Sequence, residues 1–262
     1  MPELPDVEVY RQYVDATALK QTVKRVQVNA PKVLRDISAR SLGRRLAGQR
    51  FKRTSRRGKH LFVELTDGSH LLLHFGMTGN VHYDAGDGEK QPKFAAVVFT
   101  FENDCVFSYV NKRKLGTVSI IDDPEEFAAE NRLGPDALSL SEEQFLEKLN
   151  DGRGGIKAFL MNQRLMAGIG NEYSDEILFQ ARLHPAAEPR SLDRTTRKRL
   201  FRTLKSVLHK AIECRVDPEK FPRSFITPRR REGAPCPRGN GTLVKKTVAG
   251  RSSYFCPQCQ QA

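Results

Sequence analysis

The stretch MPELPDVE, residues 1–8, places two prolines and three acidic residues at the start of the chain. We expect Met1 to be removed, since an initiator methionine is usually trimmed before a small residue, and Pro2 then becomes N-terminal. An α-amine has a pKa of about 8, roughly two units below that of lysine, so part of it is neutral and nucleophilic. Glu3 lies beside this amine as a proton donor or acceptor. The alternative is structural: Pro5 begins a helix that the acidic residues cap.

The chain has 262 residues, of which 39% are hydrophobic. This length predicts two domains with a small appendage. No apolar run approaches about 20 residues, and Asp6, Glu8 and Arg11 interrupt the first segment, so we expect neither a membrane span nor a signal peptide. Five unevenly placed cysteines fit a reducing cytoplasm better than a disulfide framework.

The net charge of +13 is concentrated in two clusters. Residues 190–262 hold 18 basic and 5 acidic side chains, whereas residues 1–189 hold 26 of each sign. Within this balanced part, residues 44–59 hold eight basic side chains and no acidic one. Because neutralised phosphates release counterions, such clusters indicate a polyanion partner. A solvated basic face is the alternative, and two separate clusters favour nucleic acid.

The sequence predicts an α+β fold. Residues 5–19 have helical periodicity, and the strand patterns that follow include two hairpins, over residues 61–75 and 94–110. Residues 1–121 therefore predict an N-terminal helix on an antiparallel β-sandwich. We assign residues 122–135 to a linker, 136–232 to a helical domain and 233–262 to a terminal β-hairpin.

Three cysteines near the end of the chain have zinc-ribbon spacing. Cys256 and Cys259 form one CxxC turn, and Cys236 begins a similar turn in which Gly239 takes the place of the fourth ligand. Three thiolates can hold zinc with a water or an outside ligand, although structural sites almost always have four protein ligands. The alternative is a metal-free hairpin held by packing.

Three glycine-bounded motifs can bind nucleic acid. GIGNEY, residues 168–173, precedes a helix whose N-terminus favours an anion, although such turns also serve as connectors. Gly58 can bring Lys59 against a phosphate, or the motif is only a basic strand end. Met77 lies in the turn HFGMTG, residues 74–79, where it either wedges into stacked bases or fills the core.

Together and in this order, PELPDVE, RGK, HFGMTG, GIGNEY and the incomplete CxxC pair resemble the formamidopyrimidine-DNA glycosylase (Fpg/Nei) family. The resemblance extends over essentially the whole chain. It implies a bifunctional DNA glycosylase and abasic-site lyase of base excision repair that removes oxidised bases, such as 8-oxoguanine and formamidopyrimidines, from duplex DNA. It also implies a helix-two-turn-helix domain in residues 136–232 and a zinc-finger-like hairpin after it. The first residues are closer to the oxidised-purine branch than to endonuclease VIII.

The resemblance implies a role for each matching residue. Pro2 is the nucleophile that attacks C1′ and forms a Schiff base, and Glu3 protonates the opening sugar ring. β,δ-Elimination then leaves a one-nucleotide gap. Lys59 holds the phosphate of the lesion and assists catalysis, and Arg251 clamps the flanking phosphates. The implied DNA contacts are His74, Met77, Arg113, Leu115, Lys157 and Asn171, of which Met77 and Arg113 fill the gap left by the flipped base.

Several positions depart from the family pattern. Asp6 stands where glutamate is usual, Leu115 replaces an intercalating phenylalanine, and Glu172 stands where isoleucine is common. Residues 215–228 are short for a loop that covers an oxidised purine, and Gly239 removes a zinc ligand. Substrate preference depends on these positions.

Two other functions stay open: an endonuclease VIII-like enzyme that prefers oxidised pyrimidines or abasic sites, and a non-catalytic damaged-DNA binding protein. For the enzyme we expect a monomer that binds damaged double-stranded DNA in the cytoplasm, at the nucleoid. We expect no membrane partner and no organic cofactor, with zinc as the one candidate ion.

Overall fold

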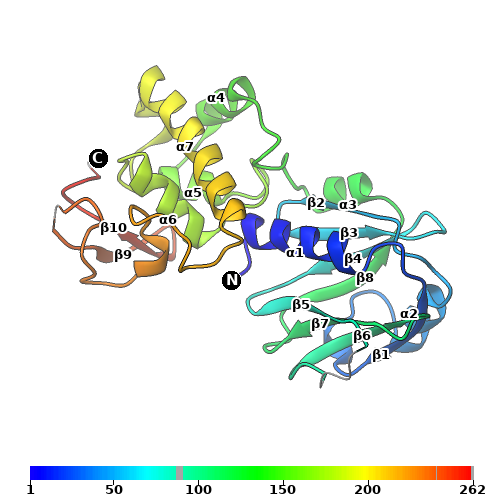
Figure 1. Cartoon of the computed structure of the whole chain (residues 1–262). Helices are drawn as coiled ribbons and strands as arrows, with labels where there is room; N and C mark the ends of the chain where they lie inside the picture. The colour runs from blue at the N-terminus through cyan, green and yellow to red at the C-terminus, as the bar shows by residue number, and fades with distance from the viewer. Residues whose placement is uncertain (87–90, 240, 261–262) are drawn as a thin grey trace. The chain divides into compact units, whose positions relative to one another are not determined.

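The computed structural model describes residues 1–86, 91–239 and 241–260 (Figure 1). The described chain divides into two compact units. The first contains Met1–Pro2 and Asp6–Asn131, and the second contains Glu3–Pro5 and the chain from Arg132 onward. None of the helices in these ranges is long and apolar enough to cross a lipid bilayer.

The first unit contains two antiparallel four-stranded sheets, which confirms the expected β-sandwich. Their strand orders are β1-β6-β7-β5 and β2-β3-β4-β8. Alternate apolar residues of both sheets share one hydrophobic core, in which Phe51 contacts the rings of Phe99, Phe101 and Phe107 edge to face. The strands are β1 (Val23–Val28), β2 (Arg53–Arg57), β3 (His60–Glu64), β4 (His70–His74), β5 (Gly79–Asp84), β6 (Ala95–Phe101), β7 (Val106–Asn111) and β8 (Thr117–Ile121).

Three helices accompany these sheets: α1 (Leu4–Thr17), α2 (Ala39–Leu46) and α3 (Pro124–Glu130). Helix α1 buries Val7 and Val14 in the sandwich core. Helix α3 begins after Asp123, whose carboxylate accepts a hydrogen bond from the Glu125 N–H at 2.7 Å. Half of the stretch expected to be a linker is therefore a helix, because Asp123-Pro124 starts a helix.

The second unit is helical and ends in a hairpin. Its helices are α4 (Glu142–Asp151), α5 (Ile156–Met161), α6 (Asn171–Gln180) and α7 (Arg194–Glu213), and its strands are β9 (Val244–Val248) and β10 (Arg251–Phe255). Helix α4 begins with a capping box, in which the side chains of Ser141 and Gln144 each accept a hydrogen bond from the other's backbone N–H. Leu4 packs in the core of this unit, and its N–H donates to the Gly168 carbonyl at 3.0 Å. These contacts fix the chain around Glu3.

Candidate functional site

The carboxylate of Glu3 lies at the N-terminus of α6. It accepts hydrogen bonds from the backbone N–H groups of Gly170 at 2.7 Å, Glu172 at 2.8 Å and Tyr173 at 3.3 Å, and Glu3 is only 1% exposed. The positive end of the helix dipole and these amides stabilise the ionised carboxylate. The anion at this turn is thus Glu3 itself, so these amides are not available to a phosphate, contrary to the expectation for GIGNEY.

Pro2 precedes this carboxylate and is buried. With Met1 attached, its nitrogen belongs to a peptide bond and cannot act as a nucleophile. Removal of Met1, which is 52% exposed, converts this nitrogen into a secondary amine whose pKa is about 8 in an unperturbed chain. The adjacent residues then combine a nucleophilic amine with a buried carboxylate.

A network of buried charges joins α5 and α6 to the hairpin. Lys157 Nζ donates to Asp175 Oδ1 at 2.6 Å and to the Ser252 carbonyl at 3.2 Å. Asp175 Oδ2 accepts from Arg230 Nε at 2.8 Å and from the Tyr254 N–H at 3.1 Å. Lys157 is fully buried, so its ammonium binds Asp175 rather than standing at the surface where the resemblance expects a phosphate contact.

The hairpin that this network holds carries Arg251 at the start of β10. Arg251 is exposed and opposes Val248 across a tight turn, in which Ala249 and Gly250 both have positive φ. Asn171, the first residue of α6, is half-buried, and its side-chain oxygen has no hydrogen-bond partner within the described part of the chain. Both residues remain candidate phosphate contacts.

In the first unit, two turns bring Met77, Arg113 and Leu115 together. Gly76 has a φ of +59°, and a Cβ on it would collide with the backbone of Leu115. The Arg113 N–H donates to Thr78 Oγ1 at 3.0 Å. Met77 and Leu115 are 44% and 49% exposed, which is unusual for large apolar side chains in a folded domain and suits insertion between bases.

Lys59 lies in the turn between β2 and β3 of the same unit, and His74 is the last residue of β4 in the same sheet. Lys59 follows Gly58, which turns β2 into β3 with a φ of +57°. His74 faces His60 with ring centroids 5.0 Å apart. Burial lowers the pKa of His60 to about 3 and also lowers the pKa of His74. The His74 ring is therefore neutral near pH 7 and can contact DNA only as a neutral donor or acceptor.

The three cysteines form one cluster, as their spacing predicts. The sulfur atoms of Cys236, Cys256 and Cys259 all lie within 4.8 Å of one another, with Cys236 and Cys259 3.6 Å apart. A Cβ on Gly239 would meet no atom within 4 Å, and its φ is +76°. The donor set fits zinc through three thiolates, with the fourth position left to an outside ligand.

Three family models match the chain in order. They are the formamidopyrimidine-DNA glycosylase N-terminal domain over residues 1–118, the formamidopyrimidine-DNA glycosylase H2TH domain over 133–221, and a zinc finger found in FPG and IleRS over 233–262. The chain belongs to the formamidopyrimidine-DNA glycosylase family. Membership confirms the resemblance, and with it a DNA-repair glycosylase fold with an H2TH domain and a zinc-finger region.

Relatives and solved structures in this family match over nearly the full chain. The formamidopyrimidine-DNA glycosylase of Pelotomaculum thermopropionicum is 33% identical and that of Thermus thermophilus 34%, covering 100% and 99% of this chain and 99% and 98% of theirs. A complex of Lactococcus lactis Fpg with abasic-site DNA has a TM-score of 0.88 at 29% identity, covering 99% of this chain and 100% of that one. A complex of MutM with carbocyclic 8-oxo-G DNA has the same TM-score and identity, with full coverage of both chains.

Sequence reasoning missed Asp175 and Arg230, which complete the buried network. The signal available was Lys157 itself, since a lysine inside the apolar stretch IKAFLM requires a buried counter-charge. The pattern does not indicate which acidic residue supplies it.

Proposed function

We propose that this chain is a bifunctional DNA glycosylase and abasic-site lyase that excises oxidised bases from duplex DNA. The observation that best supports this proposal is the buried Glu3 carboxylate, which follows Pro2 in the chain and is held by three backbone amides. The favoured substrates are oxidised purines, 8-oxoguanine and formamidopyrimidines. The partner is damaged double-stranded DNA, bound by a monomer in the cytoplasm at the nucleoid.

The proposed chemistry begins when the Pro2 amine, freed from Met1, attacks C1′ of the damaged nucleotide. The base leaves with its bonding electron pair and takes up a proton from solvent. The Glu3 carboxylate takes the proton that the Pro2 nitrogen loses after attack and passes it to the ring oxygen as the sugar opens. The resulting iminium at C1′ is permanently cationic, because Pro2 is a secondary amine, and it acidifies the C2′ protons. Loss of a C2′ proton then expels the 3′ phosphate, and a second elimination expels the 5′ phosphate.

The DNA-contacting residues follow from charge and exposure. Lys59 and Arg251 are proposed to bind phosphates at the lesion, and Asn171 to add a neutral contact. Met77, Arg113 and Leu115 are proposed to fill the space of the everted base, which offsets part of the few kcal/mol that extrusion costs. Lys157 supports the Arg251 contact from inside the second unit, because its ammonium holds the hairpin that carries Arg251. Cys236, Cys256 and Cys259 would hold zinc, and the bound ion would cross-link the chain around the same hairpin.

The reaction products test this proposal. We expect duplexes that contain 8-oxoguanine or formamidopyrimidine to be cut to a one-nucleotide gap with phosphate at both ends. Glu3→Gln should abolish excision, because an amide can neither accept the proton from the Pro2 nitrogen nor pass it to the ring oxygen. A wild-type protein that binds the lesion but leaves the strand uncut would favour the damaged-DNA binding function instead. Faster excision of oxidised pyrimidines than of purines would favour the endonuclease VIII-like alternative.

A further inference from the structure

Helix α7 carries a basic surface that the proposed function does not use (Figure 1). Residues 194–212 of this helix include seven basic side chains and no acidic one. The apolar residues of the helix pack in the core of the second unit, and its opposite side is exposed. Arg194, Arg199 and Arg202 are exposed on that side, and Lys198 is half-buried beside them. We call these four residues the α7 basic face.

Few acidic groups neutralise the α7 basic face. Within the described residues its one ion-pair partner is Glu142 of α4, which lies 3.2 Å from Lys198 and 3.9 Å from Arg202. Arg202 is 75% exposed, so water screens the longer contact. Asp193 caps the helix, but the first turn contains no acidic residue, although the positive end of the helix dipole disfavours cations there. Like charges four residues apart also repel each other. These charges therefore lower the stability of the helix, and packing does not account for them.

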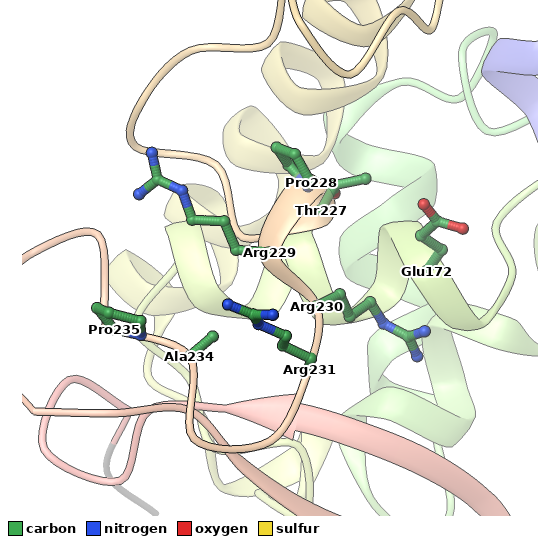
Figure 2. Close-up of a pocket in the computed structure, with 8 residues that line it drawn as sticks. All are labelled: Glu172, Thr227, Pro228, Arg229, Arg230, Arg231, Ala234 and Pro235. Carbon is green, nitrogen blue, oxygen red and sulfur yellow. The ribbon is translucent and has the colours of Figure 1, made fainter.

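The α7 basic face lies away from the contacts proposed for the lesion. Arg199 Nε donates to the carbonyl of Ala181, at the C-terminus of α6, at 3.3 Å. Glu3 is bound at the N-terminus of the same ten-residue helix, whose length is roughly 15 Å. Figure 2 shows a separate group of arginines, residues 229–231, on the segment beside Glu172 near that N-terminus. An anion on the α7 basic face is therefore bound apart from the lesion.

The chemistry of this surface favours nucleic acid over a protein partner. The other exposed residues on this side include Thr195 and Ser206, and none of the large apolar side chains that the described chain exposes lies on α7. Protein interfaces usually contain an apolar core, whereas protein–DNA interfaces are polar and positively charged. From Arg194 to Arg202 the helix rises roughly 12 Å, a length over which one DNA strand carries about three or four phosphates.

We propose that the α7 basic face is a second binding surface for duplex DNA, which contacts phosphates without reading the base sequence. The inference goes beyond the proposed function, because it concerns undamaged DNA and requires no catalysis. A chain with two such surfaces can hold the lesion duplex and a second DNA segment at the same time. It can then pass from one segment to the other without release into solution.

A triple variant tests this surface. It replaces three exposed arginines and leaves the pair of Lys198 with Glu142 intact: Arg194→Gln, Arg199→Gln and Arg202→Gln. The matched control removes the same charge from three exposed residues of the first unit that lie outside both basic clusters of the sequence: Lys20→Gln, Arg25→Gln and Arg40→Gln. Circular dichroism establishes that both variants are folded. The affinity for an undamaged duplex is then measured at several salt concentrations.

We expect the α7 variant to reduce the slope of log affinity against log salt by about two to three units, since each lost phosphate contact removes about 0.9. The control should keep the wild-type slope. An unchanged slope in the α7 variant, or an equal fall in the control, would overturn the proposal. An unchanged slope together with a loss of polyglutamate binding would assign the surface to an acidic protein partner instead.

A second measurement asks whether both surfaces act at once. Protein saturated with a short duplex that contains a tetrahydrofuran abasic analogue is titrated with a fluorescently labelled undamaged duplex. Wild type and the control should bind the second duplex, and the α7 variant should not. Saturated wild-type protein that leaves the second duplex free would contradict a separate surface. If the protein does not bind the tetrahydrofuran duplex at all, the proposed function fails, whereas the salt slopes still decide this inference.

Discussion

Replacing Asp175 by asparagine tests the idea that a buried charge network holds the hairpin to α6. The side chain keeps its shape but loses its charge, so the Lys157 ammonium and the Arg230 guanidinium lose their counter-charge. Asp175 is 1% exposed and Lys157 is fully buried. Burial lowers the pKa of Lys157, and the Asp175 carboxylate 2.6 Å away opposes that effect.

The expected loss of stability depends on how deeply the ion pair is buried and not on the distance between its charged atoms. Removing one partner of a buried ion pair typically costs about 3–5 kcal/mol, because the remaining charge stays desolvated and unpaired. The pair Lys210–Glu213 has the same 2.6 Å separation, but its side chains are 40% and 68% exposed. A pair of that kind contributes about 0–1 kcal/mol. Glu213→Gln is therefore a matched control in the same unit.

Urea denaturation, followed by circular dichroism of this helical unit, measures both variants. We expect Asp175→Asn to lower the free energy of unfolding by about 3 kcal/mol or more and Glu213→Gln by less than about 1 kcal/mol. DNA affinity should also fall for Asp175→Asn alone, since the Arg251 hairpin loses its attachment. Equal destabilisation by the two variants, or a cost for Asp175→Asn below about 1 kcal/mol, would refute the reasoning.

Three other measurements probe separate parts of the molecule. Burial keeps His60 neutral down to a pKa of about 3, whereas an unfolded histidine has a pKa of about 6.5. Below a pH of about 6.5 only the unfolded state takes up this proton, so the free energy of unfolding falls by up to about 1.4 kcal/mol for each pH unit between these two values. The melting temperature of His60→Phe should therefore fall less on acidification than that of wild type. An equal fall in both proteins would count against this assignment. Metal analysis should find one zinc per wild-type chain and none in Cys236→Ser, so a zinc-free wild-type protein contradicts the three-thiolate site. Arg251→Ala should weaken DNA binding and reduce its salt slope by about one unit, whereas an unaltered slope removes Arg251 from the phosphate contacts.

The parts of the fold that periodicity and turn chemistry determine were predictable from the sequence. The hairpins at residues 60–74 and 95–111, the capping box at Ser141 and the three-cysteine cluster all follow from local signals. Strand β2 was missed because its residues RTSRR have no apolar alternation, although it pairs along its whole length with β3. Tertiary pairing overrides local propensity there.

The candidate site was predictable only where motifs lie within short stretches. Glu3 and the turn Gly168–Tyr173 were both identified. The hydrogen bonds between them were not, because a carboxylate and amides almost 170 residues apart leave no periodic signal in the sequence. For the same reason Lys157 was identified as a phosphate contact, whereas the structure pairs it with Asp175. Charged groups that pair with residues far away in the sequence could be identified only from the structure.

The most direct test of the central claim is borohydride trapping on an abasic-site duplex. Intact mass first establishes that Met1 has been removed, since an acylated Pro2 nitrogen cannot react. We expect the trimmed protein to form a covalent adduct with the DNA, and peptide mapping to place the DNA-derived mass on Pro2. Absence of an adduct from correctly trimmed protein, or an adduct that maps to a lysine instead, would contradict the assignment of Pro2 as the nucleophile.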